Sequence, residues 1–272
     1  MTQLRMAGKP VAESIRNTLK EKFATHHVTL ATFIIGDNPA AHVYKRSLLK
    51  TAASLGITTR DVELPADVTQ QQAERALEEL SLDNTVTGIL PLMPVPSHLD
   101  RTSIIYKLDP DKDMDCIHPL NSGRFYLGAS PWAPCTPRAC MAILKYYQIP
   151  LAGEDAVMVG YGDVVGRPLT LMLIEERCTV TVCRSTTKDL PAKTSQADLL
   201  LSAVGTPNLI TEPMIRPDAV VVDVGINSVD GHLEGDIPEA AKLARASAYT
   251  PVPGGVGVVS NLMVMQTLTR NL

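Results

Sequence analysis

The sequence has few aromatic residues and no long run of one charge or of apolar side chains. Aromatic residues make up 4% of the 272 residues, and no basic run exceeds two residues. Nucleic-acid binding depends on basic surfaces and often on stacking aromatic side chains, so that class of function is disfavoured. The apolar runs are far shorter than the roughly 20 residues of a membrane span, and the N-terminus lacks the apolar core of a signal peptide. We therefore predict a cytoplasmic protein with neither nucleic-acid nor membrane partners.

Cysteine and histidine are too few and too scattered for a disulfide framework or a metal site. The five cysteines form no Cys-x-x-Cys pair, and the six histidines have no metal-ligand spacing. We expect buried, reduced thiols and no bound metal. The acidic segment 109–115 contains alternate carboxylates, but no glycine or distal glutamate completes a calcium loop. A solvated loop is the favoured interpretation of such a cluster.

Helical and strand patterns alternate along the first half of the chain. Apolar residues at Val11, Ile15, Leu19 and Phe23 recur every fourth position and predict a helix. The elements predicted in this half are 10–23, 28–35, 40–54, 58–64, 70–80 and 87–92. This alternation indicates an α/β fold with a mainly parallel sheet. Ligands of such sheets bind beyond the carboxyl ends of the strands, which directs attention to the loops 36–44 and 91–96.

The second half contains a candidate dinucleotide-binding turn. A short apolar strand, 156–159, leads into Gly160-x-Gly162-x-x-x-Gly166 and then an apolar run that can start a helix. A glycine turn before a helix cradles a pyrophosphate, although this motif is weak evidence alone. Before it we predict a helix from Cys135 to about residue 147, with Thr136 as N-cap. The elements predicted after it are strands 179–183, 197–203 and 219–224 and helices 187–194 and 260–268.

Two further segments bear on ligands. The end of the second strand of a dinucleotide domain selects between cofactors, because an acid binds a ribose 2′-hydroxyl whereas arginine accepts a 2′-phosphate. Here Arg184 and Ser185 occupy that position without an acid, so NADP is favoured over NAD, unless Arg184 is only a surface residue. The rigid Pro/Gly segment 250–257 suits either a tight turn or the wall of a substrate pocket.

Taken together, the segments resemble the methylenetetrahydrofolate dehydrogenase/cyclohydrolase family, often called FolD. They follow the family order over nearly the whole chain, and the last of them is highly specific. The matching segments are Gly36-Asp-Asn-Pro-Ala with Tyr44, Gly88-Ile-Leu with Pro94-Val-Pro96, Pro110-Asp-Lys-Asp-Met-Asp115, Pro134-Cys-Thr-Pro137, Val164-Val-Gly-Arg-Pro168, Asp223-Val-Gly-Ile-Asn227, Gly235-Asp236 and Thr250-Pro-Val-Pro-Gly-Gly-Val-Gly257.

The resemblance implies two domains with a folate-binding cleft between them, and a homodimer. An N-terminal α/β folate-site domain would comprise 1–136 and 251–272, and a Rossmann-like dinucleotide domain 137–250. The family oxidises 5,10-methylenetetrahydrofolate with NAD(P)⁺ and hydrolyses the methenyl product to 10-formyltetrahydrofolate. Carried over by position, Tyr44 would pack on the folate rings and Asp115 would accept hydrogen bonds from the pterin, and these two are the candidate catalytic residues. The residues expected to touch substrate are Tyr44, Leu48, Leu92, Asp115, Pro253, Gly254 and Gly255.

The cofactor would lie along the glycine turn and the ends of the following strands. The residues expected to contact it are Gly160, Tyr161, Gly162, Asp163, Val165, Gly166, Arg184, Ser185, Gly205 and Ile226. The family usually has Gly-Arg-Ser where this chain has Gly160-Tyr161-Gly162. That arginine commonly helps to bind the 2′-phosphate, so its loss weakens the case for NADP, and Arg184 could compensate.

Two departures fall at the reaction centre. The family places a catalytic lysine four residues after the tyrosine and a glutamine in the strand-end segment, and here these positions are Leu48 and Leu92. Lys50 lies about 200° around the helix from Leu48 and Lys45 about 100° from Tyr44, so neither should substitute. Ser47 lies nearer the Tyr44 face but carries no charge.

The departures separate the two reactions. Opening the methenyl bridge needs an activated water and proton transfers, whereas hydride transfer needs only two rings held together. We therefore predict a dehydrogenase with weak or absent cyclohydrolase activity. The alternatives are a bifunctional enzyme that uses other residues, a folate- or nucleotide-binding pseudoenzyme, and a dehydrogenase with a changed substrate.

Overall fold

The computed structural model describes residues 3–130 and 132–272, which form two compact units. The three-stranded unit contains Ser14–Cys135 and Asn261–Leu272, and the six-stranded unit contains the N-terminal segment up to Glu13 and Thr136–Ser260. The chain passes between the units within three helices, α1 (Gly8–Phe23), α6 (Cys135–Tyr146) and α10 (Val256–Leu268). This division assigns the segment up to Glu13 and residues 251–260 to the six-stranded unit, whereas the expected boundaries gave both segments to the folate-site domain.

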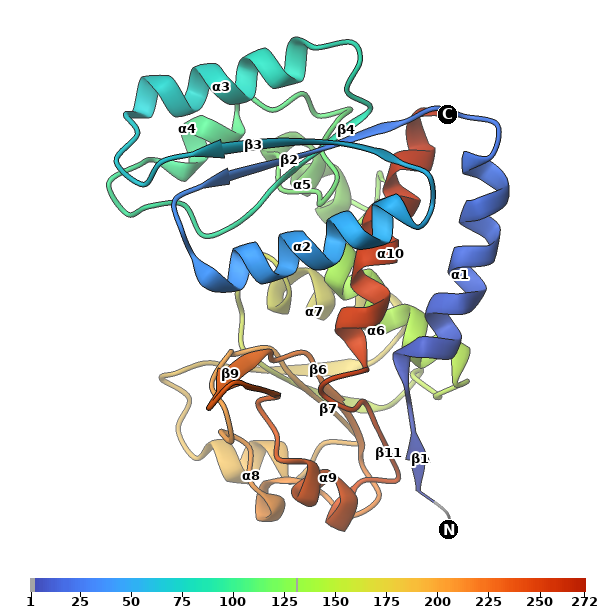
Figure 1. Cartoon of the computed structure of the whole chain (residues 1–272). Helices are drawn as coiled ribbons and strands as arrows, with labels where there is room; N and C mark the ends of the chain where they lie inside the picture. The colour runs from blue at the N-terminus through green and yellow to red at the C-terminus, as the bar shows by residue number, and fades with distance from the viewer. Residues whose placement is uncertain (1–2, 131) are drawn as a thin grey trace. The chain divides into compact units, whose positions relative to one another are not determined.

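The sheet of the three-stranded unit is parallel, with the order β3-β2-β4 (Figure 1). Its strands are β2 (Thr29–Ile35), β3 (Thr58–Leu64) and β4 (Gly88–Pro91). Ala31, Phe33 and Ile35 on one face of β2 pack with the buried face of α3 (Gln70–Leu82). The central position of β2 explains why its residues are almost all apolar and buried, as strands covered on both faces must be. The remaining helices are α2 (Pro39–Ala53), α4 (Arg101–Ile105) and α5 (Pro119–Tyr126).

The sheet of the six-stranded unit is also parallel, with the order β1-β11-β8-β7-β5-β6. The strands are β1 (Leu4–Arg5), β5 (Asp155–Val159), β6 (Thr179–Cys183), β7 (Leu199–Ser202), β8 (Val220–Asp223) and β11 (Ala248–Tyr249). Because β6 lies on one side of β5 and β7 on the other, the strand order reverses at β5. Such a switch point is where open α/β sheets bind their ligands.

Shorter elements complete the six-stranded unit. They are α7 (Gly166–Glu175), α8 (Leu190–Thr194), α9 (Glu239–Arg245), the 3-10 turn Glu212–Met214 and an antiparallel hairpin of β9 (Asn227–Val229) and β10 (His232–Glu234). The core combines the inner strands with residues of these helices, including Val157, Leu200, Val221 and Ala241. A last 3-10 turn, Thr269–Asn271, follows α10 in the three-stranded unit.

Most predicted elements are confirmed, and three details are wrong. The last helix, expected over 260–268, already begins at Val256. Thr136 lies inside α6 rather than capping it, and its hydroxyl contacts Ser260 Oγ at 2.9 Å. The helix expected over 187–194 begins only at Leu190, because Asp189 caps it from a left-handed conformation. The sequence patterns also missed the short elements α4, α5, α9, β9 and β10. They missed β1 and β11 too, whose two-residue pairing joins segments far apart in the chain.

Composition-based expectations concern membranes, metals and thiols. None of the helices in the described ranges has both the length and the apolarity to cross a bilayer. Residues 3–130 and 132–272 also contain no group of three or more His, Cys, Asp and Glu placed to hold a metal ion. All five cysteines are buried thiols, as predicted, and burial raises the pKa of Cys140 to about 12.

Candidate active site and cofactor turn

Helix α2 carries Tyr44 and Leu48 on one face. Asn38 caps the helix by accepting a hydrogen bond from the Ala41 amide at 3.0 Å, and Pro39 occupies its first position. Residues four apart lie on the same helix face, so Leu48 is stacked one turn after Tyr44. Tyr44 is half-buried, and Leu48 is fully buried.

Leu92 follows β4 directly and lies at the end of the same sheet. Its amide donates to the Phe33 carbonyl at 2.8 Å, which extends the pairing of β4 with β2, and its side chain is buried. Because β2 and β4 are parallel neighbours, the segments that follow them, 36–44 and 91–96, both leave from the carboxyl end of the sheet. The expectation that these two loops share the carboxyl end of one sheet is confirmed.

The lysines near Leu48 are directed elsewhere. The Lys45 ammonium donates to Asp61 at 2.9 Å and also to Glu63, both on β3. Burial lowers the pKa of Lys45, but its hydrogen bonds to Glu63 and Asp61 outweigh this and raise the pKa above its ordinary value. Lys50 is exposed. The Lys45 ammonium is therefore engaged by the carboxylates of β3, and that neither lysine replaces the one absent at position 48 stays a prediction.

Ser47 is engaged by the C-terminal helix. The buried Asn261 of α10 donates through Nδ2 to Ser47 Oγ at 2.8 Å and to Thr51 Oγ1 at 3.5 Å. This contact fixes α10 against α2 beside Leu48. The serine hydroxyl thus helps to hold the packing of the unit.

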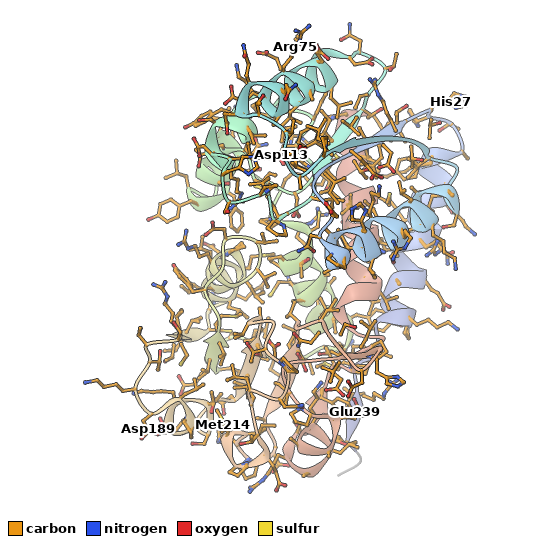
Figure 2. All side chains as sticks on the ribbon, turned by 60° about the vertical axis from the view of Figure 1, so that its left-hand side comes forward. His27, Arg75, Asp113, Asp189, Met214 and Glu239 are labelled. Carbon is orange, nitrogen blue, oxygen red and sulfur yellow. The ribbon has the colours of Figure 1, made fainter. Side chains whose placement is uncertain are left out.

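The acidic segment 109–115 is not a solvated loop, which corrects the favoured interpretation. Asp113, which is labelled in Figure 2, is buried. It accepts hydrogen bonds from the amides of Asp115, Ile117 and His118 and from Asn121 Nδ2. These four donors take the place of the water that would solvate an exposed carboxylate, and a charged group can be buried only when it is hydrogen-bonded in this way. Asp113 thereby fixes the loop that presents Asp115.

Asp115 itself is half-buried and lies at the start of α6. Its Oδ1 accepts a hydrogen bond from the Cys135 amide at 2.7 Å, and Cys135 is the first residue of that helix. A carboxylate at a helix N-terminus is stabilised by the free amides and the helix dipole. Tyr44 and Leu48 thus lie on α2, Leu92 lies directly after β4, and Asp115 lies in the loop that Asp113 fixes, all in one unit.

The glycine turn in the six-stranded unit requires two of its three glycines. Gly160 has φ +102°, and a Cβ there would lie 2.5 Å from the Ala203 carbonyl oxygen. A Cβ on Gly166 would collide with the Gly160 carbonyl, whereas one on Gly162 would meet nothing within 4 Å. Val165 precedes α7 without a side-chain cap. Backbone amides at such a helix start fit the pyrophosphate of a dinucleotide.

The Tyr161 ring in this turn lies close to two arginine side chains. The Arg167 guanidinium lies 5.3 Å and the Arg184 guanidinium 6.0 Å from the centre of its ring. Arg167 also pairs with Asp163 at 2.8 Å. Arg184 and Ser185 are exposed at the end of β6. The structure therefore brings Arg184 to the turn, as the sequence suggested, and adds Arg167, which the sequence analysis missed.

The loops after β7 and β8 expose the other predicted cofactor residues. Gly205 has φ +71° and is exposed, and Ile226 is 60% exposed although it is apolar. Val204 beside Gly205 is exposed too. Apolar side chains exposed at the carboxyl edge of a parallel sheet suit a flat ligand ring.

The Pro/Gly segment belongs to the six-stranded unit. The Gly254 carbonyl accepts a hydrogen bond from the Gly8 amide at 2.8 Å, and Gly254 has φ +102°. A Cβ on Gly255 would lie 2.5 Å from the Pro251 carbonyl oxygen. Pro253 follows a cis peptide bond. The expected substrate residues Pro253, Gly254 and Gly255 thus lie in a tight turn of the six-stranded unit. The other expected substrate residues, Tyr44, Leu48, Leu92 and Asp115, belong to the three-stranded unit.

The fold and these sites define a two-domain α/β oxidoreductase with a Rossmann-like nucleotide domain. Two family models match the chain. Residues 6–115 match the catalytic domain of tetrahydrofolate dehydrogenase/cyclohydrolase, and residues 134–272 match its NAD(P)-binding domain. The chain belongs to the tetrahydrofolate dehydrogenase/cyclohydrolase family, whose chemistry lies in one-carbon folate metabolism.

Individual relatives are similar along their whole length. The chain is 40% identical over 263 residues to the bifunctional protein FolD of Exiguobacterium sibiricum, covering 95% of each sequence. The crystal structure of the bifunctional enzyme FolD from Campylobacter jejuni is 37% identical, with a TM-score of 0.92 and coverage of 98% of this chain and 97% of that one. FolD of Trypanosoma brucei, complexed with NADP cofactor and inhibitor, is 32% identical, with a TM-score of 0.94 and coverage of 99% and 97%.

Proposed function

We propose that this protein oxidises 5,10-methylenetetrahydrofolate to the 5,10-methenyl form with NAD(P)⁺, and that its cyclohydrolase activity is weak or absent. The observation that carries the second part is the pair of buried leucines, Leu48 and Leu92. Hydrolysis of the methenyl bridge needs a water and groups that move protons, and neither leucine can supply them. Removing such groups typically costs about 10²–10⁴-fold in rate.

The residues around the leucines support this split. Lys45 is held by Asp61 and Glu63, and Lys50 is exposed. A fully bifunctional enzyme would therefore have to recruit a different acid or base. Oxidation makes no such demand, because it needs only the folate and nicotinamide rings held face to face.

A pseudoenzyme is the second candidate, favoured by the same two leucines. Against it stands the cofactor turn, in which Gly160 and Gly166 keep the close backbone approach that a pyrophosphate cradle requires. A bound nicotinamide dinucleotide would supply the hydride acceptor. The residues that would hold it are those of the glycine turn and the exposed loops at Gly205 and Ile226.

On the substrate side, each candidate residue has a role that its chemistry permits. Tyr44 offers a half-buried ring for stacking, and Asp115 offers a carboxylate to the adjacent N–H donors of the pterin edge. The tight turn of Pro253, Gly254 and Gly255 gives a rigid backbone surface that would line the folate pocket.

NADP is the proposed cofactor in preference to NAD. Arg184, Arg167 and Tyr161 gather where the adenosine ribose of a dinucleotide is expected, at the end of the strand after the glycine turn. Guanidinium groups match phosphate geometry, and no acid occupies the segment 184–187. Tyr161 thus stands where the family usually has an arginine, and its ring lies against two other arginines, Arg167 and Arg184.

A homodimer is the proposed assembly. Strand β3 lies at the edge of its sheet, and most of its side chains are exposed. An edge strand presents backbone N–H and C=O groups that can pair with a second copy. Molecular mass in solution by light scattering tests this, and a monomeric mass at micromolar concentration would contradict it.

One set of assays tests the proposed reaction. Methylenetetrahydrofolate is supplied with NADP⁺ or NAD⁺ while reduced cofactor and methenyl product are followed together. We expect stoichiometric formation of both, faster with NADP⁺. Methenyltetrahydrofolate is then supplied alone, and its hydrolysis should stay close to the spontaneous rate. Hydrolysis well above that rate would refute the cyclohydrolase part, and folate binding without turnover would favour the pseudoenzyme. Turnover of a different pterin or ring compound alone would indicate a changed substrate.

A further inference from the structure

Asp236 is a buried carboxylate to which two loops are hydrogen-bonded. Its side chain is fully buried, and its Oδ2 accepts hydrogen bonds from Ser202 Oγ and the Val204 amide, both at 2.8 Å. Its Oδ1 accepts from the Thr206 amide at 3.0 Å and from Asn227 Nδ2 at 3.2 Å. The carboxylate therefore holds the end of β7, the loop that follows it, and the first residue of the β9–β10 hairpin.

A second buried carboxylate fixes Asp236 in place. Asp223 accepts hydrogen bonds from the Asp236 amide at 3.0 Å and the Ile237 amide at 3.1 Å. It also forms a buried ion pair with Lys242 at 2.7 Å. Burial raises the pKa of Asp223, and the Lys242 ammonium opposes that rise. A Cβ on Gly225 would collide with Asp236 Oδ1, so the carboxylate packs directly against the backbone of residue 225.

The strand order says which half of a dinucleotide these loops would meet. The pyrophosphate belongs at the glycine turn after β5, and the adenosine ribose at the end of the next strand, β6. Because β6 and β7 flank β5 on opposite sides, the nicotinamide half must extend toward β7 and β8. Gly205 and Ile226 lie in the loops after those strands, and Asp236 anchors the residues on either side of Gly205.

We propose that Asp236 is a positioning residue for the nicotinamide half of the cofactor. It acts through the backbone of 204–206 and through Asn227, and it does not touch the cofactor. This inference rests on the cofactor site of the proposed function. Its distinctive consequence is that loss of the carboxylate weakens binding of the whole dinucleotide while binding of the adenosine half is preserved.

Asp236→Asn isolates the effect because it keeps the side-chain shape. An asparagine amide has one acceptor oxygen and one N–H₂ group. If the N–H₂ group occupies the Oδ2 position, it faces the Val204 amide, and if it occupies the Oδ1 position, it faces the Thr206 amide. In either orientation a backbone N–H of the loop loses its acceptor. Hydrogen bonds to a charged group are among the stronger ones, so we expect dinucleotide affinity to fall by about 10–100-fold.

The test compares whole cofactors with their adenosine halves. Dissociation constants of NADP⁺ and adenosine 2′,5′-bisphosphate, and of NAD⁺ and ADP, are measured by calorimetry on the wild-type protein and on D236N. For the better dinucleotide, D236N should weaken binding by about 10–100-fold and leave the matching fragment within about threefold. In turnover, KM for the dinucleotide should rise and KM for methylenetetrahydrofolate should not.

Asp198→Asn is the matched control. Asp198 lies just before β7, at the opposite end of that strand, and accepts hydrogen bonds from the Asp155 amide at 3.0 Å and from Arg216. D198N makes the same chemical change at the other end of β7, away from the loop that Asp236 holds, so it should lower the melting temperature without changing the affinity for either ligand of a pair.

The possible outcomes distinguish failure of the positioning role of Asp236 from failure of the proposed function. Equal weakening of dinucleotide and fragment in D236N, or no weakening of either, would overturn the positioning role. If D236N does not fold, Ser202→Ala removes a single donor and should weaken the dinucleotide about threefold without affecting the fragment, and an unchanged dinucleotide affinity would refute the role. If the wild-type protein binds no dinucleotide at all, the proposed function fails instead.

Discussion

Restoring the two polar residues at the reaction centre should create cyclohydrolase activity in the variant Leu48→Lys/Leu92→Gln. Position 48 lies one turn after Tyr44 on the same face of α2, and position 92 lies at the end of the neighbouring strand β4. Both new side chains therefore start from rigid elements. The expected gain in methenyl hydrolysis is about 10²–10⁴-fold, the usual contribution of positioned acid and base groups.

The burial of Leu48 sets the cost in stability and also helps the chemistry. Leu48 is fully buried, so the ammonium of a lysine there would lose much of its hydration. Breaking or leaving unpaired a buried charge costs about 3–5 kcal/mol in unfolding free energy. The flexible lysine stem lets the ammonium reach toward water in some conformations. In the conformations that stay buried, burial lowers the pKa of the lysine toward the range of a general base. The melting temperature should fall by about 6–20 °C.

The assay follows loss of methenyltetrahydrofolate in excess of the spontaneous rate, with dehydrogenase turnover measured in parallel. Leu49→Lys is the control, because Leu49 is half-buried and points about 100° away from Leu48 on the helix. L49K should add a lysine without adding hydrolysis. The reasoning would be refuted if the folded double variant hydrolyses no faster than L49K while it still oxidises methylenetetrahydrofolate.

Three further predictions concern other parts of the chain. Lys45→Met should lower the unfolding free energy by about 1–2 kcal/mol, because its ion pairs to two partly exposed carboxylates are lost. The ratio of methenyl hydrolysis to methylene oxidation should not change, and a changed ratio would give Lys45 a catalytic role. Arg184→Ala should raise KM for NADP⁺ at least about tenfold and leave KM for NAD⁺ nearly unchanged, and parallel changes would contradict 2′-phosphate binding. Hydrogen bonds from Thr85, then Arg60, lower the pKa of Asp83 to about 2, so its contribution to stability is present above about pH 4 and is lost as the pH falls toward 2. The stability of Asp83→Asn, followed by circular dichroism during acid unfolding, should not show this loss between about pH 4 and pH 2. If NMR shows that the Asp83 carboxyl of the wild-type protein titrates near about pH 4, the prediction is wrong.

The sequence was sufficient for features that depend on neighbouring residues. Helix periodicity placed Leu48 on the Tyr44 face, because the 3.6-residue turn fixes which side chains share a face. The spacing of Gly160 and Gly166 predicted a turn that the structure shows to be sterically required at both positions. The resemblance of ordered motifs to one family also followed from sequence, and the family models confirm it.

Only the tertiary structure decided the roles of the buried charged residues. The acidic segment looked solvated, yet Asp113 is a buried acceptor for four donors. The partners of Lys45, Asp61 and Glu63, lie 16 and 18 residues further along the chain. Asp236 was visible as part of a motif, but its hold on the loop around Gly205 was not. A carboxylate is tolerated inside a protein only when donors converge on it, and sheet topology, rather than local spacing, determines which donors do so.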